Sequence, residues 1–433
     1  MTTPLDNITF KARTHPKHRF QNLYGLLNTD SLYQSWGQLN KQAAAGVDGM
    51  TISHYQQRLP ENINRLSQDL KQKCYRANDI KRIFIPKSNG KQRPLGLPTV
   101  EDKRVQQSVS QILQSIWEQD FMRNSYGYRP NKSAHQAVHS LGLNLQFKGY
   151  GYIVEADIKG FFDNLDHDWL MQMLKQRIDD NALLNLINQW LKARIKSPDG
   201  EYAKPSSGSP QGGIISSVLA NIYLHYALDL WFEKKVKPRM KGRAMLIRYA
   251  DDFVCAFQYA HDAERFYKVL PKRLAKFNLE VAEEKTSLMR FSRFHPSRKR
   301  QFAFLGFAFY WAKDMSGKAH LRRETSTKKY KTSLKEYYIY IKTQRHQKLN
   351  HWLPVLRRKL MGYRNYFGLP DNSRSCDRLY NDIVRSLFKW LNRRSGRKSY
   401  NWSHFKTMLT YYGLERPRVS KRFIHVDWYQ ARV

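Results

Sequence analysis

The sequence predicts an α+β fold divided into more than one domain, and three observations support this prediction. Residues 248–257 place apolar and aromatic side chains on both sides of two adjacent aspartates, Asp251 and Asp252. Such runs favour strands and aspartate favours turns, so we expect a β-hairpin with both carboxylates at its tip. Residues 100–122 instead repeat apolar side chains at helical spacing. Finally, 433 residues are enough for two or three domains.

The charge of the chain indicates a polyanionic partner. There are 75 Lys and Arg against 36 Asp and Glu, a formal net charge of +39. This excess favours nucleic acid over the alternative, a basic coat on an unrelated enzyme. Residues 301–433 hold 29 Lys and Arg against 8 Asp and Glu, so +21 of the +39 lies in the last 133 residues.

Cysteine usage and hydropathy indicate a soluble protein of a reducing compartment. Cys74, Cys255 and Cys376 are far apart and form neither a disulfide framework nor a zinc motif. The first 20 residues lack the apolar core of a signal peptide. The longest apolar run, 302–312, is shorter than the roughly 20 residues that span a bilayer. We predict a buried strand there, and no membrane association.

The pattern of residues 1–75 predicts helices. Residues 39–49 are predicted to be the end of a helix that stops in Gly-Val-Asp-Gly. A loop that touches nucleic acid is the alternative for this turn. Residues 80–98 read as two strands joined at 88–90. Lys87 and Arg93 flank that turn, where they either reach a triphosphate or lie on a solvated hairpin face.

A helix is expected over 100–122, followed by a loop at 124–133 that mixes aromatic and cationic residues. Tyr126, Arg129 and Lys132 in this loop suit stacking on bases and pairing with phosphates, although ordinary tyrosine-rich loops have the same composition.

Residues 152–167 begin as a strand that ends at Asp157. A single aspartate at such a place is most often a helix N-cap. The later aspartate pair gives it another meaning, because two-metal phosphoryl chemistry needs carboxylates from separate strands around cations about 4 Å apart. If the strands are neighbours, Asp157, Asp251 and Asp252 supply that arrangement.

A helix is predicted over 168–195, and a Gly/Ser/Pro loop at 204–219 then opens into an apolar helix that runs to about Phe232. The loop suits a phosphate, through glycines such as Gly212, or is a plain junction. No Walker-type motif is present.

Beyond the hairpin, we expect a helix over 260–277, a strand–turn–strand over 279–291 with Lys285 at the turn, and a strand over 302–311. The pattern past Thr325 is helical and basic. We place a domain boundary at 315–325, where Gly317 and the change in charge coincide.

Together these segments resemble the reverse transcriptases encoded by bacterial group II introns and their group II-like relatives. The matching pieces occur in the family's order, and eight in order are very unlikely to arise by chance. A shorter, looser match at 356–368, LRRKLMGYRNYFG, is similar to the helical thumb, or maturase, region. The eight pieces are AGVDG (45–49), IPKSNGKQRPLGLPTVEDKRVQQ (85–107), SYGYRP (125–130), VEADIKGFFDNLDH (154–167), SGSPQGGIISSVLANIYL (207–224), RYADDF (248–253), the Lys285 turn and FLGF (304–307).

The resemblance implies a right-hand polymerase with an antiparallel palm sheet, mixed fingers and an α-helical basic thumb. Its parts would be a mostly helical N-terminal extension (1–75), fingers (76–150), a palm with finger insertions (151–315) and a thumb or maturase-like domain (316–433). The implied activity is RNA-directed DNA synthesis from dNTPs on an RNA template with a DNA or RNA primer.

Carried over residue by residue, Asp157 and Asp251 would be the principal ligands of two Mg²⁺ ions, or of Mn²⁺ in their place. Asp252 would assist, and the Ile158 carbonyl would lie near one ion. Oxygen-rich coordination suits Mg²⁺. Lys285 would donate a proton to pyrophosphate.

The resemblance also implies a nucleotide pocket. Lys87 and Arg93 would hold the triphosphate, Phe162 would exclude a ribose 2′-hydroxyl, and Gln211 with Gly212 would line the pocket. The nucleic-acid contacts would come from the loop and the thumb. They would be Tyr126, Arg129, Lys132, Tyr249 (at the primer end), Arg357, Arg358 and Arg364.

The chain departs from many intron proteins because it offers no paired CxxC motifs and no HNH-like block. Mobility by its own second-strand cleavage is therefore doubtful. A splicing cofactor (maturase) of a group II intron and a host reverse transcriptase in DNA repair or phage defence stay open as biological roles. An unrelated two-metal nuclease would leave the Lys87/Arg93 hairpin and the Gly212 loop unexplained. We expect a cytoplasmic, nucleoid-associated bacterial protein.

Overall fold

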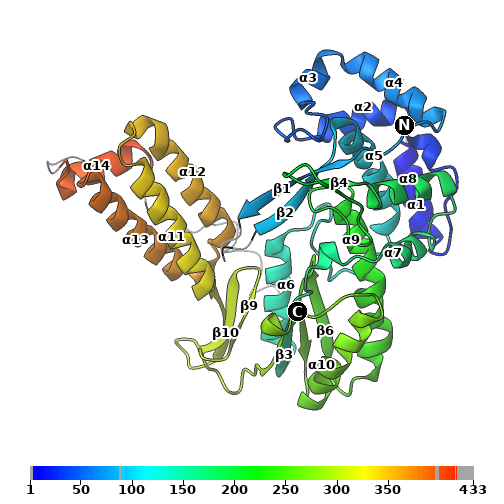
Figure 1. Cartoon of the computed structure of the whole chain (residues 1–433). Helices are drawn as coiled ribbons and strands as arrows, with labels where there is room; N and C mark the ends of the chain where they lie inside the picture. Colours follow the sequence, from blue (N-terminus) through cyan, green and yellow to red (C-terminus); the bar gives the residue numbers. More distant parts are fainter. Residues whose placement is uncertain (1–2, 87–89, 91, 395–398, 415, 417–433) are drawn as a thin grey trace.

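The computed structural model describes residues 3–86, 90, 92–394, 399–414 and 416. It is a mixed α+β structure with three antiparallel or mixed sheets and a separate C-terminal group of helices (Figure 1). None of the helices in these described ranges combines the length and the apolar character needed to cross a membrane.

The central sheet has the order β6-β7-β3-β8, and every neighbouring pair is antiparallel. Alternate side chains enter two different cores. Val154 and Cys255 pack with α9 and α10, whereas Ile153 and Val254 pack with α6. Because both faces are covered, the strands read as nearly continuous apolar runs. The strands are β3 (Tyr152–Ala156), β6 (Ala244–Tyr249), β7 (Asp252–Phe257) and β8 (Ser287–Arg290), and the helices are α6 (Ala134–Phe147), α9 (Ser216–Leu224) and α10 (Ala260–Ala275).

The predicted aspartate hairpin is confirmed. Tyr249 pairs with Asp252, which leaves Ala250 and Asp251 as a two-residue turn between β6 and β7. β8 is the second strand expected in 279–291. The first is reduced to a single bridge, Ile158 to Val281, followed by a 3₁₀ turn over Glu283–Lys285.

The expected single strand at 302–311 is wrong. The segment forms two strands, β9 (Gln301–Phe304) and β10 (Phe307–Lys313), around a tight turn at Leu305 and Gly306. Both turn residues have positive φ, +51° and +81°. Such a turn joins antiparallel strands tightly, and here the only sequence signal was the single glycine.

Gly317, where the domain boundary was predicted, lies in the turn between β10 and β11 (Ala319–Thr325). These two strands form one sheet with β9, in the order β11-β10-β9. The helical part therefore begins after β11, at Thr327. Helices α11 (Thr327–Gln344), α12 (Leu349–Phe367), α13 (Ser373–Leu391) and α14 (Trp402–Tyr411) share a core of their own (Figure 1). Phe367 of α12 and Cys376 of α13 also pack with the strands β9–β11.

The N-terminal part is helical, as expected, and packs on the long buried helix α5 (Val100–Trp117). Residues 39–49 are an exception, because α2 already ends at Gln38. Gly46 lies against the start of α5, where a Cβ atom would come within 2.7 Å of the Thr99 Cα. This glycine is therefore required by close packing. The helices are α1 (Pro4–Thr14), α2 (Thr29–Gln38), α3 (Ile52–Gln57) and α4 (Leu59–Lys71).

A second sheet, ordered β2-β1-β4-β5, joins the predicted hairpin to a later segment of the chain. β1 pairs antiparallel with β2 and parallel with β4. The helix predicted over 168–195 is divided into two, which precede β4. These elements are β1 (Ile80–Pro86), β2 (Gln92–Leu97), α7 (His167–Leu174), α8 (Asn181–Leu191), β4 (Ile195–Lys196) and β5 (Tyr202–Ala203).

The helix that begins at α9 continues as two π-helical turns, His225–Asp229 and Phe232–Val236. π turns are rare and are frequent at functional sites. The first one brings His225 into the core, where its ring meets Phe121 edge-on at 5.6 Å. His225 is only 3% exposed, and its Nδ1 has no hydrogen-bond partner among the described residues.

The contribution of His225 to stability is expected to fall in acid. Burial lowers the pKa of His225 to about 4, whereas an unfolded histidine titrates near 6.5. The unfolded state therefore binds the extra proton between these values, so the contribution of His225 to stability falls as the pH drops from about 6.5 to about 4, while Asp252 and Glu155, whose pKa values are raised to about 7, act in the opposite direction. The loss should reach about 3 kcal/mol. Urea unfolding at several pH values measures it.

His225→Phe should flatten this part of the pH dependence, while a control change at the exposed His404 should not. An unchanged slope in His225→Phe would contradict the role of His225.

Candidate active site

The three predicted carboxylates meet at one end of the central sheet. Asp157 follows the last residue of β3, and Ala156 pairs with Phe253. Asp157 is therefore next to Asp252, the first residue of β7, while Asp251 lies in the turn before it. The neighbouring strands assumed from the sequence are thus present, and they bring Asp157, Asp251 and Asp252 together.

Burial and mutual repulsion shape the charge of this cluster. Burial, and then the nearby charges of Asp157 and Asp251, raise the pKa of Asp252 to about 7. Burial and the charge of Asp157 also raise the pKa of Asp251. Crowded carboxylates behave in this way when no cation neutralises them. The site therefore favours positive charge.

Lys285 supplies one positive charge. Its ammonium group donates a hydrogen bond to Oδ2 of Asp157, and this contact raises the pKa of Lys285. About 60% of the lysine side chain is exposed, against 20% of that of Asp157. Lys285 thus contacts Asp157 and remains open to solvent, and its role as a proton donor stays a prediction.

Glu155 is a fourth carboxyl group that sequence reasoning missed. It lies two residues before Asp157, so both side chains point to the same face of β3. Burial raises the pKa of Glu155 to about 7, and the charge of Asp157 adds to this. The alternation of a strand was the signal that could have identified it.

A divalent cation fits this cluster only with oxygen atoms from elsewhere. Within the described ranges, no three His, Cys, Asp or Glu side chains already surround a position for a metal ion. The Ile158 carbonyl is one further donor. The amide of Ala282 donates a hydrogen bond to the carbonyl of Asp157, and the amide of Lys159 donates one to the carbonyl of Glu280. Ile158 between them therefore points its own carbonyl away from that segment. Substrate phosphates commonly complete such Mg²⁺ sites.

Hydrogen bonds join β2 to the loop that contains Gln211 and Gly212. Arg93 donates from Nε to Oε1 of Gln211 at 2.7 Å, and the Gly96 amide donates to the Gln211 carbonyl at 2.6 Å. Gly212 has φ +111°, and a Cβ there would lie 2.7 Å from the Gly96 oxygen. Arg93, Gln211 and Gly212 are therefore held together, and their role at a nucleotide stays a prediction. Lys87 lies outside the described residues.

Phe162 contacts Tyr128, which belongs to the loop after α5. Phe162 is 7% exposed, and its ring meets Tyr128 edge-on at 6.3 Å. Tyr128 is about half exposed and lies within the electrostatic reach of Asp251 and Arg93. It is the second residue that sequence reasoning left out of the site, although it belongs to the aromatic loop singled out there.

The loop residue Arg129 requires a correction. Only 5% of its side chain is exposed, and it pairs with Glu118 at 2.9 Å. It also donates to the carbonyls of Met122 and Ser125, both at 2.8 Å. Tyr126 is likewise buried, at 8% exposure. These two residues hold the loop in place and are not available to a phosphate or a base. Lys132 lies 5.5 Å from the Tyr126 ring and is partly exposed.

The carboxylates open into a cleft of about 630 Å³ that continues onto the basic face of α11. Lys328 and Lys329 line this cleft together with Asp157, Asp252 and Lys285. Tyr249 stands at the end of β6, partly buried, and pairs with Asp252.

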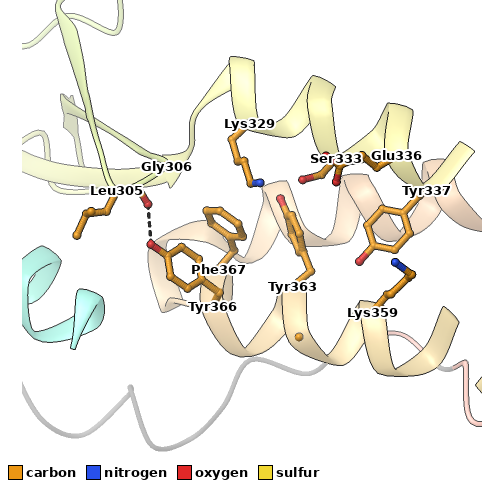
Figure 2. Close-up of a pocket in the computed structure, with 11 residues that line it drawn as sticks. Leu305, Gly306, Lys329, Ser333, Glu336, Tyr337, Lys359, Tyr363, Tyr366 and Phe367 are labelled. Carbon is orange, nitrogen blue, oxygen red and sulfur yellow. Dashed lines mark hydrogen bonds between the residues drawn. The ribbon is translucent and has the colours of Figure 1, made fainter. Parts of the chain in front are cut away.

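A second cavity, of about 590 Å³, lies past the Leu305–Gly306 turn between α11 and α12 (Figure 2). Tyr366 crosses from α12 to donate a hydrogen bond to the Leu305 carbonyl at 2.9 Å. The predicted contacts Arg357 and Arg364 line a third cavity, of about 450 Å³, beside α13, and Arg358 is exposed on α12.

Comparison with known proteins agrees with this geometry. Residues 85–309, just over half of the chain, match the family model described as reverse transcriptase (RNA-dependent DNA polymerase). The group II intron-encoded protein LtrA of Lactococcus lactis subsp. cremoris is 28% identical over 85% of this chain and 74% of its own length. The protein YkfC of Escherichia coli K12 is 32% identical over 56% of this chain and 72% of its own length.

A shorter similarity links the chain to an intron maturase. Nuclear intron maturase 1, a mitochondrial protein of Arabidopsis thaliana, is 30% identical over 22% of this chain and 13% of its own length.

Proposed function

The chain belongs to the reverse transcriptase family and is an RNA-directed DNA polymerase, and from this premise we propose that it joins dNTPs to a primer 3′-hydroxyl at Asp157, Asp251 and Asp252. The observation that carries the proposal is the meeting of these carboxylates at one end of the central sheet, where Asp157 and Asp252 line a cleft that continues onto α11. In this proposal the central sheet is the palm, the β1–β2 sheet belongs to the fingers and α11–α14 form the thumb.

We propose two Mg²⁺ ions as the cofactor, with Mn²⁺ as a substitute. Asp157, Asp251 and the Ile158 carbonyl would hold them, with Asp252 assisting. When bound, such ions activate the 3′-hydroxyl and neutralise the triphosphate charge. The raised pKa values of Asp251 and Asp252 support this assignment, because a cluster that resists full ionisation is stabilised by added positive charge.

The remaining residues of the site bind and orient the nucleotide. Arg93, fixed by Gln211, is placed to pair with a triphosphate oxygen. The Gly212 backbone can approach the nucleotide closely, and Phe162 closes the side where a 2′-hydroxyl would lie. Lys285 stays protonated through its contact with Asp157, so it can give a proton to the departing pyrophosphate.

Primer extension on an RNA template, with and without Mg²⁺, tests this function in the wild-type protein. Metal-dependent cDNA supports it. If a well-folded wild-type protein makes no product with Mg²⁺ or Mn²⁺, the proposed site chemistry is wrong.

A second candidate function is that of a splicing cofactor acting on structured intron RNA. A basic cavity of about 840 Å³ favours it, because it lies between the segment 73–79 and α8, away from the carboxylates. A splicing assay with Asp251→Asn separates the two functions, since a cofactor role needs RNA binding alone. Five cations line this cavity: Lys73, Arg76, Lys192, Arg194 and Lys204.

RNA binding is expected to depend steeply on salt. Positive charge is concentrated on the C-terminal helices, and each phosphate contact releases a counterion. If about six contacts form, affinity should fall about 10³-fold between 50 and 200 mM salt. Filter binding of a structured RNA at several salt concentrations measures the slope. A nearly salt-independent affinity would mean that contacts other than phosphates dominate binding.

A further inference from the structure

The turn that carries Asp251 has an unfavourable backbone conformation. Ala250 has φ +56° at the first position of a two-residue hairpin turn, a place that glycine usually fills. A residue in such a conformation keeps it only where its surroundings hold it. The question is therefore which groups hold Ala250.

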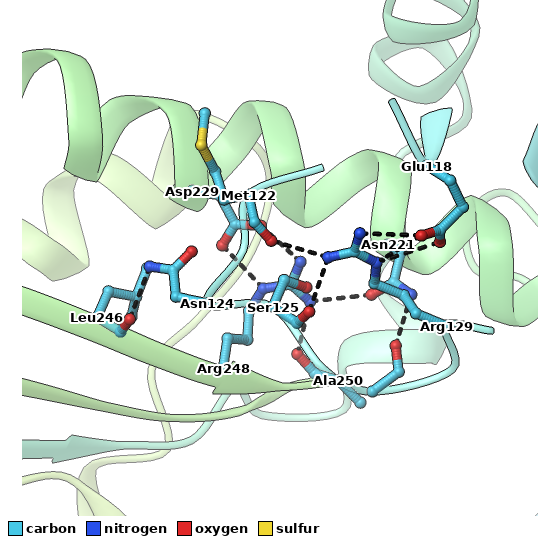
Figure 3. A network of polar contacts seen from close by, with 11 residues as sticks. Glu118, Met122, Asn124, Ser125, Arg129, Asn221, Asp229, Leu246, Arg248 and Ala250 are labelled. Carbon is cyan, nitrogen blue, oxygen red and sulfur yellow. Dashed lines mark hydrogen bonds and ion pairs between the residues drawn. The ribbon is translucent and has the colours of Figure 1, made fainter. Parts of the chain in front are cut away.

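Arg248 holds the turn from beneath. Its side chain is fully buried, and Nη1 donates to the carbonyl of Ala250 at 3.0 Å. The same guanidinium is fixed by Asp229, through Nε at 2.8 Å and Nη2 at 2.6 Å, and by Oδ1 of Asn221 at 3.0 Å. Figure 3 shows these contacts converging on Arg248. Asp229 and Asn221 therefore fix the position of the guanidinium that bonds to the turn.

The π turn explains how Asn221 and Asp229 reach the same guanidinium. Eight residues separate them, which in a regular α-helix turns the two side chains about 80° apart. The π turn over His225–Asp229 accommodates one extra residue. The eight residues then make close to two full turns, and both side chains face Arg248.

The loop before α6 holds the turn from the other side. A Cβ at Gly127 would lie 2.3 Å from the amide nitrogen of Ala250. Asn221 also donates to the Gly127 carbonyl at 2.7 Å, and Tyr126 donates its amide to the carbonyl of Arg248 at 2.9 Å. The buried Arg129 described above anchors this loop through Glu118.

We propose that Arg248, Asp229 and Asn221 are positioning residues that set the Ala250–Asp251 turn and so aim the Asp251 carboxylate at its metal. This inference rests on the proposed role of Asp251. Stability alone does not account for a buried ion pair, because apolar residues of similar volume often replace one without loss. The hydrogen bond from Arg248 to the Ala250 carbonyl is a contact that apolar residues cannot make.

The test replaces the whole pair with Arg248→Met/Asp229→Leu in the full chain. The unfolding temperature should stay close to that of the wild type. Hydrogen exchange should accelerate at residues 249–252 while α10 stays protected. Single-turnover addition of dNTP should slow about 10- to 100-fold, the usual effect of removing a group that orients a metal ligand. The Kd for primer–template should not change.

Arg248→Lys serves as a second variant in case the double variant fails to fold. Lysine keeps the charge next to Asp229, but one amino group cannot also reach Asn221 and the Ala250 carbonyl. We expect a folded protein with the same two defects. The matched control is Arg177→Met/Asp120→Leu, another buried pair, in which Arg177 binds the carbonyls of Ala12 and Pro16. Its addition rate should equal that of the wild type.

Wild-type exchange at 249–252 and a wild-type addition rate in a folded Arg248 variant would overturn the inference. Asp251→Asn in the same assay separates the two proposals. If that variant remains fully active while the Arg248 variants loosen the turn, the proposed role of Asp251 is wrong. The role of Arg248 in holding the Ala250–Asp251 turn is then still supported.

Discussion

Asp251→Asn is expected to abolish cDNA synthesis while leaving RNA binding intact. The substitution keeps the size of the side chain and removes the charge that a metal ligand needs. Removing a group that only orients a metal ligand commonly lowers activity about 10- to 100-fold. Removing the ligand itself should therefore lower the rate of cDNA synthesis at least 100-fold. Gel-based primer extension with Mg²⁺ measures the rate, and filter binding measures the RNA affinity.

Glu280→Gln is the matched control for this experiment. Glu280 is an exposed carboxylate that pairs with Lys159 at 3.1 Å on the neighbouring segment. The same loss of charge there should leave synthesis unchanged. Polymerisation by Asp251→Asn at a rate comparable to wild type would remove Asp251 from the proposed site.

Phe162→Ala is expected to let the enzyme use ribonucleotides. The Phe162 ring is held edge-on by Tyr128 and by Phe161, at 5.4 Å, so it cannot swing aside for a 2′-hydroxyl. Excluding a group of this size by the shape of a pocket changes the ratio of kcat/KM between two substrates roughly 10- to 200-fold. The ratio of kcat/KM for dATP over ATP should fall by about that factor, mainly because ATP is used better.

The control for this prediction is Phe161→Leu. Phe161 faces the core, where it meets Tyr223 edge-on at 6.5 Å, so its loss should lower stability without changing the sugar preference. If Phe162→Ala keeps the wild-type ratio, another residue excludes the 2′-hydroxyl, and Tyr128 is the nearest candidate.

The aspartate hairpin could be predicted because its pattern is local. Apolar strands on both sides of two aspartates leave few other structures. Asp157 could be assigned only together with that hairpin, since an isolated aspartate after a strand has a common capping role. The register Ala156 to Phe253 then turns two local patterns into one cluster.

Arg129 and the strand at 302–311 could not be predicted, because their structure depends on distant or weak signals. Arg129 is neutralised by Glu118, on the far side of the preceding turn. Sequence composition does not distinguish a buried, paired arginine from one that meets a phosphate. The apolar run 302–312 is interrupted by Leu305 in a positive-φ conformation, which a leucine rarely adopts.

The position of β3 in the central sheet has a consequence for how the protein is made. β3 lies between β7 and β8, whose residues follow about a hundred or more positions later in the chain. A ribosome therefore releases β3 long before either partner strand exists. Until residue 257 emerges, the apolar segment around Ile153 and Val154 has two open edges, and one edge stays open until residue 290 emerges. Open edges favour aggregation. We expect folding to be slow and truncations before β8 to be insoluble.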